Sequence, residues 1–103
     1  MDFDDRIAGY LGIAQKAGKV AAGDSAVLVA LKERKAYLVL LAVDSAASVR
    51  EEIISIAQAQ GLPFYIWSDK ITLGLYVGKS RRGALAILDA GLANATRKVL
   101  EMA

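Results

Sequence analysis

The sequence predicts an α/β protein in which a sheet is sandwiched between layers of helices. Helical and strand periods alternate along the chain, and two apolar runs lack the polar alternation of a half-exposed strand. The 103 residues, of which 55% are hydrophobic, are enough for one domain over residues 1–103 with its own buried core.

The first half of the chain alternates two helices with two strands. Asp2 can cap a helix that we expect to end near Gly18. A short extended piece at 20–22 then leads to Gly23 and a second helix. The run 37–43 has no polar alternation, as expected of a central strand covered on both faces.

A capping pattern opens the second half of the chain. Ser48 is followed three residues later by Glu51, so we expect a helix from Ser48 to about Gly61. Pro63 then turns the chain into a second apolar run, residues 64–67.

The last third of the chain adds one short and one longer helix around a strand. Ser68 or Asp69 can cap a short helix that ends near Gly78. Residues 84–88 read as a third buried strand, and residues 93–103 as a final helix. The predicted order is therefore four helix–strand pairs followed by a fifth helix.

The composition excludes several classes of site. The chain has no cysteine and no histidine. Disulfides, thiol nucleophiles, zinc sites and histidine-based triads are therefore excluded. We expect no metal, no cofactor and no enzyme activity.

The N-terminal residues and the length of the apolar runs indicate where in the cell the protein is found. The first residues, Met1 to Asp5, are acidic where a secretion signal would be basic. The longest apolar run, 37–43, is far too short to span a bilayer. We therefore expect a cytoplasmic protein with no membrane partner.

The cations gather in two segments, although the net charge is only +2. Residues 16–35 and residues 69–82 each carry a net charge of +3. If the fold joins these segments, they would form one anion-binding face. Two ordinary solvated surfaces are the alternative.

The turn before the second helix suits the edges of nucleic-acid bases. Gly23 permits close approach of another backbone, Asp24 accepts hydrogen bonds, and Ser25 donates or accepts them. The alternative is that Asp24 or Ser25 only caps its own helix. The glycine spacing from Gly18 also resembles a P-loop, but Asp24 stands where that motif needs lysine, which argues against nucleotide hydrolysis.

A basic loop bracketed by glycines follows the short helix. Lys79, Ser80, Arg81 and Arg82 place three cations in four positions, which suits contact with phosphates. A solvated turn is the alternative. By charge and proximity in the sequence, two further candidates for phosphate contact are Lys19 and Lys32. Asp89, after the third long strand, is expected to cap a helix.

These motifs together resemble the kink-turn-binding ribosomal protein family, the archaeal L-seven-Ae and eukaryotic L-thirty-e proteins. The C-terminal half carries Leu73-Gly74-x-x-Val77-Gly78-Lys79-x-x-Arg82-Gly83, followed by Ile87-Leu88-Asp89-Ala90-Gly91. The N-terminal half carries Ala17-Gly18-Lys19, Gly23, and the run Leu38-Val39-Leu40-Leu41-Ala42 with Asp44. This half is similar to the bacterial YlxQ-type members in particular.

The resemblance implies a three-layer α/β/α sandwich around a roughly four-stranded mixed sheet. It implies a non-catalytic, ribosome-associated role, with a kink-turn or similarly bent, rRNA-like structured RNA as the partner. In the family, the positions of Gly23, Asp24, Ser25 and Ala26 read tandem sheared G·A pairs. The loop at residues 79–82 closes over a flipped-out nucleotide beside the bend.

The chain departs from the family pattern at three of these positions. The best-characterised binders have Asn where this chain has Ser25, Glu where it has Ala26 and Lys where it has Val29. The departures remove base-edge and phosphate contacts, of which a good base-specific pair is worth about 1–3 kcal/mol.

Two functions from different classes therefore compete. The first is RNA binding, which requires that folding bring the Gly23 turn and the arginine-bearing loop side by side. The second is a protein-interaction or scaffold module with a weakened RNA-binding face, which an exposed apolar patch at Ala26, Val27 and the neighbouring loop would favour.

Overall fold

The computed structural model describes residues 2–103 and contains all nine predicted elements in the predicted order. In chain order they are α1 (Phe3–Lys16), β1 (Val20–Ala22), α2 (Asp24–Lys32), β2 (Leu38–Leu41), α3 (Ala47–Ala59), β3 (Phe64–Ile66), α4 (Lys70–Tyr76), β4 (Ala84–Ile87) and α5 (Ala90–Met102).

The four strands form one mixed sheet in the order β1-β4-β2-β3. β4 pairs antiparallel with both β1 and β2, whereas β2 and β3 are parallel. The two central strands, β2 and β4, are buried along their whole length. This burial explains why neither strand alternates with polar residues in the sequence.

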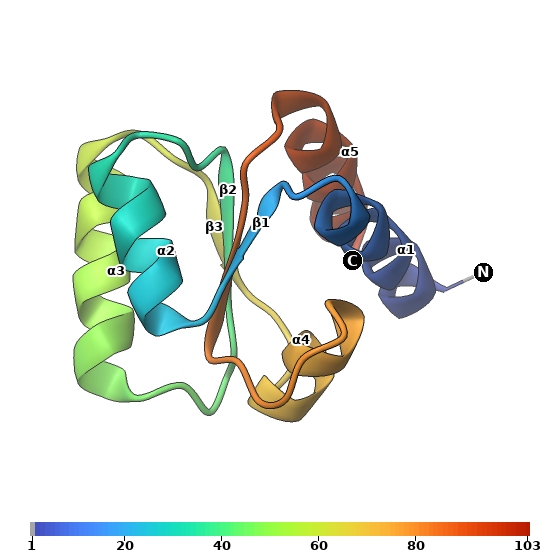
Figure 1. Cartoon of the computed structure of the whole chain (residues 1–103), viewed down its shortest axis with the longest axis horizontal. Helices are drawn as coiled ribbons and strands as arrows, with labels where there is room; N and C mark the ends of the chain where they lie inside the picture. Colours follow the sequence, from blue (N-terminus) through green and yellow to red (C-terminus); the bar gives the residue numbers. More distant parts are fainter. Residues whose placement is uncertain (1) are drawn as a thin grey trace.

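Helices cover both faces of the sheet (Figure 1). α2 and α3 form one layer, and α1, α4 and α5 form the other. One hydrophobic core lies on each face of the sheet, and successive side chains of β2 point alternately into the two cores. Leu38 and Leu40 pack with α1, while Val39 and Leu41 pack with α2. The predicted three-layer sandwich is confirmed.

Two helices begin earlier than the sequence pattern predicts. α3 begins at Ala47 with Ala46 at its N-cap, and no side chain caps it, so the predicted Ser48 cap is wrong. α5 begins at Ala90 instead of residue 93, because Asp89 accepts a 2.8 Å hydrogen bond from the amide of Leu92. The predicted role of Asp89 as a helix cap is confirmed.

The topology gives the sheet two distinct ends. β1, β2 and β3 finish, and β4 begins, at what we call the carboxyl end of the sheet. Lys19, Tyr37 and Pro63 precede their strands at the opposite, amino end, and Leu88 follows β4 there. Residues far apart in the sequence therefore gather at each end.

No helix within residues 2–103 is both long enough and apolar enough to cross a bilayer.

The loop before β4 packs directly on Gly74 of α4. The amide of Lys79 donates a 2.8 Å hydrogen bond to the carbonyl of Gly74. A β-carbon placed on Gly74 would overlap the carbonyl oxygen of Ser80. Gly74 therefore sets how closely the basic loop approaches α4.

We predict that Gly74→Ala destabilises the protein by about 1–3 kcal/mol, because a backbone group would have to move. Helix propensity alone predicts the opposite sign, a gain of up to about 1 kcal/mol. Gly9→Ala in α1 is the matched control, since a β-carbon there meets no atom of residues 2–103 within 4 Å. Urea unfolding should show a lower free energy of unfolding for Gly74→Ala and a higher one for Gly9→Ala. Equal gains would contradict the packing described here.

Candidate nucleic-acid interface

Gly23 forms the turn that joins β1 to α2 at the carboxyl end of the sheet. Its amide donates a 2.8 Å hydrogen bond to the carbonyl of Ala84, which extends the pairing of β1 with β4 by one residue. Its φ of 106° and ψ of 159° lie in a region that is accessible almost only to glycine. The turn therefore depends on the absence of a side chain.

The first turn of α2 carries no side-chain cap. Gly23 occupies the N-cap position and has no side chain to accept a hydrogen bond. Neither Asp24 nor Ser25 caps the helix, so the capping alternative is wrong for both residues. The first amides of a helix lack partners within it and carry a partial positive charge, so this helix end can receive acceptor groups of a ligand.

The basic loop is held by its own hydrogen bonds. Arg82 donates from Nη1 to Ser80 Oγ at 3.0 Å and to the carbonyl of Arg81 at 2.9 Å. Its amide donates to the carbonyl of Lys70 at 3.0 Å, which attaches the loop to the start of α4. Lys79, Ser80 and Arg81 are exposed.

The Gly23 turn and the basic loop lie against each other. A β-carbon placed on Gly23 would lie 3.4 Å from Arg82 Cδ and 3.7 Å from its Nε. In return, the Asp24 carboxylate lies 3.0 Å from where a β-carbon on Gly83 would be. We call the residues of this paired region the Gly23–Arg82 surface: Gly23, Asp24, Ser25, Lys79, Ser80, Arg81 and Arg82.

Two more loops at the carboxyl end support this surface. Asp44, after β2, accepts a 2.9 Å hydrogen bond from the amide of Lys70 at the start of α4. Asp69 caps α4 by accepting from the amide of Thr72 at 2.8 Å, and this hydrogen bond lowers the pKa of Asp69. The loop carrying Arg81 and Arg82 is thus attached to a capped helix.

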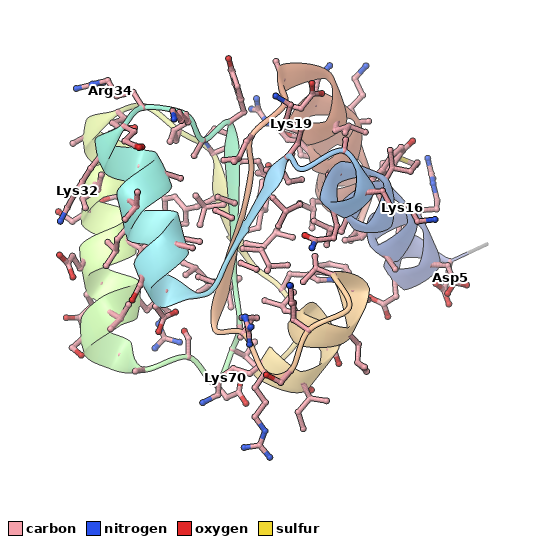
Figure 2. All side chains as sticks on the ribbon, in the orientation of Figure 1. Asp5, Lys16, Lys19, Lys32, Arg34 and Lys70 are labelled. Atoms are coloured by element: carbon pink, nitrogen blue, oxygen red, sulfur yellow. The ribbon has the colours of Figure 1, made fainter. Side chains whose placement is uncertain are left out.

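Two cations besides the predicted site residues also lie at the carboxyl end of the sheet. Lys70 begins α4 and its side chain lies at this end in Figure 2. Arg50 of α3 donates a 3.2 Å hydrogen bond to the carbonyl of Val43. Lys70 belongs to the basic segment 69–82, so its charge was visible in the sequence. The place of Arg50 depends on how α3 packs.

Lys19 and Lys32 lie away from the Gly23–Arg82 surface (Figure 2). Lys19 precedes β1, about 13 Å of extended chain from Gly23. Lys32 ends α2, about 12 Å along the helix from Asp24. Proximity in the sequence therefore does not bring these two cations to the turn, because a strand and a helix separate them from it.

The apolar patch that would favour a protein-interaction module is not formed as expected. Val27 is fully buried in the core beneath α2, although Ala26 is exposed. Val29, about one helical turn after Ala26 in α2, is 56% exposed. Within residues 2–103, no group of three or more carboxylate side chains is placed to hold a metal ion.

Comparison with known proteins confirms the family resemblance. The model of the ribosomal protein L7Ae/L30e/S12e/Gadd45 family matches residues 5–96. RNA-binding protein YlxQ of Bacillus subtilis (strain 168) is 29% identical over 91 residues, which cover 88% of this chain and 91% of that protein. RNA-binding protein YlxQ of Enterococcus faecium is 23% identical over 91 residues, covering 88% and 87%.

The fold also matches a solved structure. A protein of unknown function from Bacillus halodurans C superposes with a TM-score of 0.88 at 21% sequence identity. The match covers 93% of this chain and 97% of that one. This likeness supports the architecture alone.

We predict that Gly23→Ala destabilises the protein by about 3 kcal/mol, because alanine rarely adopts this backbone conformation. Gly61→Ala is the matched control. Its φ of 69° lies in the left-handed region, where alanine costs only about 1–2 kcal/mol. Urea unfolding of both variants measures the difference. A smaller loss of unfolding free energy for Gly23→Ala than for Gly61→Ala would contradict the turn geometry described here.

Proposed function

Because this chain belongs to the ribosomal protein L7Ae/L30e/S12e/Gadd45 family, we propose that it binds structured RNA through the Gly23–Arg82 surface. The preferred RNA is a kink-turn or a similarly bent internal loop, and ribosomal RNA is the natural source of such a structure. The chain acts as one RNA-binding domain, residues 1–103, in the cytoplasm. Family membership also confirms the prediction that the chain is not an enzyme.

The observation that carries this proposal is the contact between Arg82 and Gly23. It unites two kinds of recognition at one place. The first turn of α2 offers backbone amides and the side chains of Asp24 and Ser25, which suit base edges. The loop offers Lys79, Arg81 and Arg82, which suit phosphates.

Electrostatics assigns different roles to the two halves of the surface. Three cations of the loop and the partial positive charge of the α2 N-terminus attract the RNA backbone. The Asp24 carboxylate opposes this attraction, but it lies beside Gly83 and is only partly exposed. It can accept hydrogen bonds from the exocyclic amino groups of bases, which only an acceptor can read.

The exposed face at the start of α2 is less polar than in the family's strong binders. Ser25, Ala26 and Val29 are exposed and, at a spacing of three and four residues, lie on one face of α2. An exposed valine can neither donate a hydrogen bond to a base nor offer a positive charge to a phosphate. We therefore expect kink-turn affinity below that of family members with Asn, Glu and Lys here.

We predict that the double variant Arg81→Ala, Arg82→Ala weakens RNA binding and lowers the slope of log affinity against log salt by about 2, since two phosphate contacts are lost. A charge-matched control is Lys16→Ala, Lys98→Ala, which removes two exposed cations from α1 and α5, helices that carry no residue of the Gly23–Arg82 surface. Mobility-shift titrations at several salt concentrations measure both variants. An unchanged slope in the loop variant would exclude the loop from the interface.

We predict that Ser25→Asn with Val29→Lys raises affinity for a kink-turn RNA at least about tenfold, because one base contact and one phosphate contact are regained. The control RNA has the same sequence with the internal loop replaced by continuous base pairs. Affinity for this straight duplex should change much less. If neither the wild type nor the variant prefers the kinked RNA, the kink-turn proposal fails and the interaction module becomes the better explanation.

A further inference from the structure

A basic pocket lies at the amino end of the sheet, opposite the Gly23–Arg82 surface. Its volume is about 420 Å³. Figure 2 labels two of its residues, Lys19 and Arg34, at the end of the molecule away from Lys70. The pocket lies between the C-terminal ends of α1 and α2 and is lined by Gly18, Lys19, Arg34, Lys35, Tyr37 and Leu88.

The two helices that frame this pocket end in the same way. In α1, the amides of Gly18 and Lys19 donate back to the carbonyls of Gln15 and Ala14. In α2, the amides of Arg34 and Lys35 donate back to the carbonyls of Leu31 and Ala30. Each pattern is a Schellman motif, and it directs the lysine that follows the left-handed residue toward the pocket.

Arg34 occupies the left-handed position of its motif, with φ of 56°. α1, α3 and α4 end with the same hydrogen-bond pattern, and each has glycine at this position, namely Gly18, Gly61 and Gly78. Any side chain strains the backbone there, because the β-carbon approaches the following carbonyl oxygen. A strained residue at a pocket wall points to a role for its side chain.

The cations of the pocket are only partly neutralised by residues 2–103. Glu33 is the one acidic partner among residues 2–103, and it lies 3.6 Å from Lys35 in an exposed ion pair, a weak kind of interaction. Arg34 and Lys19 form no ion pair within the same residues. The C-termini of α1 and α2 contribute about half a negative charge each, which leaves the pocket positive.

An aromatic ring lies among these charges. Tyr37 is 49% exposed, and it lines both this pocket and a neighbouring one that contains Asn94 and Arg97. Exposed aromatic rings flanked by cations are how proteins hold single-stranded nucleic acid, by stacking on bases and neutralising phosphates.

We propose that this pocket binds an unpaired stretch of RNA, with a base stacked on Tyr37 and phosphates on Lys19, Arg34 and Lys35. The protein then holds two segments of RNA at opposite ends of its sheet. The inference builds on the proposed RNA-binding function but uses none of the residues of the Gly23–Arg82 surface.

The test is binding of a fluorescent oligouridylate of about ten nucleotides, a length that suits one small binding domain. Arg34→Gly should raise the melting temperature, because the strain disappears, and should weaken oligouridylate binding about fivefold. Tyr37→Leu should weaken it about tenfold. Lys16→Gln, which removes an exposed cation outside the pocket, should leave binding unchanged.

Two controls separate this proposal from its alternatives and from the proposed function. Arg34→Gly should not change the affinity for a kink-turn RNA without unpaired ends. If the protein binds the oligouridylate but no kink-turn RNA, that result contradicts only the proposed function. Inorganic pyrophosphate should compete poorly, since it cannot stack. Equal binding of pyrophosphate, or oligouridylate binding unaffected by Arg34→Gly and Tyr37→Leu, would overturn the inference.

Discussion

The antiparallel pairing of β1 with β4 is the constraint on which the candidate interface depends. It ends with the hydrogen bond from the amide of Gly23 to the carbonyl of Ala84. Because β1 leaves this end of the sheet as β4 enters it, the helix after β1 and the loop before β4 must meet. A turn without a side chain then lets Arg82 lie over Gly23. The interface thus follows from strand direction and one glycine.

The order of elements was predictable because each depends on local signals. Burial of β2 and β4 on both faces explains their unbroken apolar runs, and Asp2, Asp69 and Asp89 cap the helices that they precede. The Ser48 pattern does not predict the start of α3, because the chain turns at Val43 and Asp44 after β2 and already enters the helix at Ala47. Strand order was beyond reach, since pairing joins residues that are distant in the sequence.

Where the fold places the predicted site residues follows from the same distinction between local and long-range signals. The turn at Gly23 and the loop at residues 79–82 carry local signals, and both lie at the carboxyl end of the sheet. Lys19 and Lys32 were grouped with them by charge and sequence proximity, but β1 and α2 carry them to the other end. A segment that crosses the molecule separates its two ends, so charge counted along a chain does not describe charge on a face. Lys19 instead lines a pocket with Arg34, Lys35 and Tyr37, from which β1 and α2 separate it in the sequence.

The central claim, that the Gly23 turn and the basic loop act as one RNA-binding surface, is tested most directly by nuclear magnetic resonance. Isotope-labelled protein is titrated with a kink-turn RNA, and each backbone amide signal is followed. The account predicts that the amides of Ser25 and Ala26 and those of residues 79–82 shift together, with one shared dissociation constant. Shifts confined to one of the two segments, or largest on α3 and α5, would contradict it.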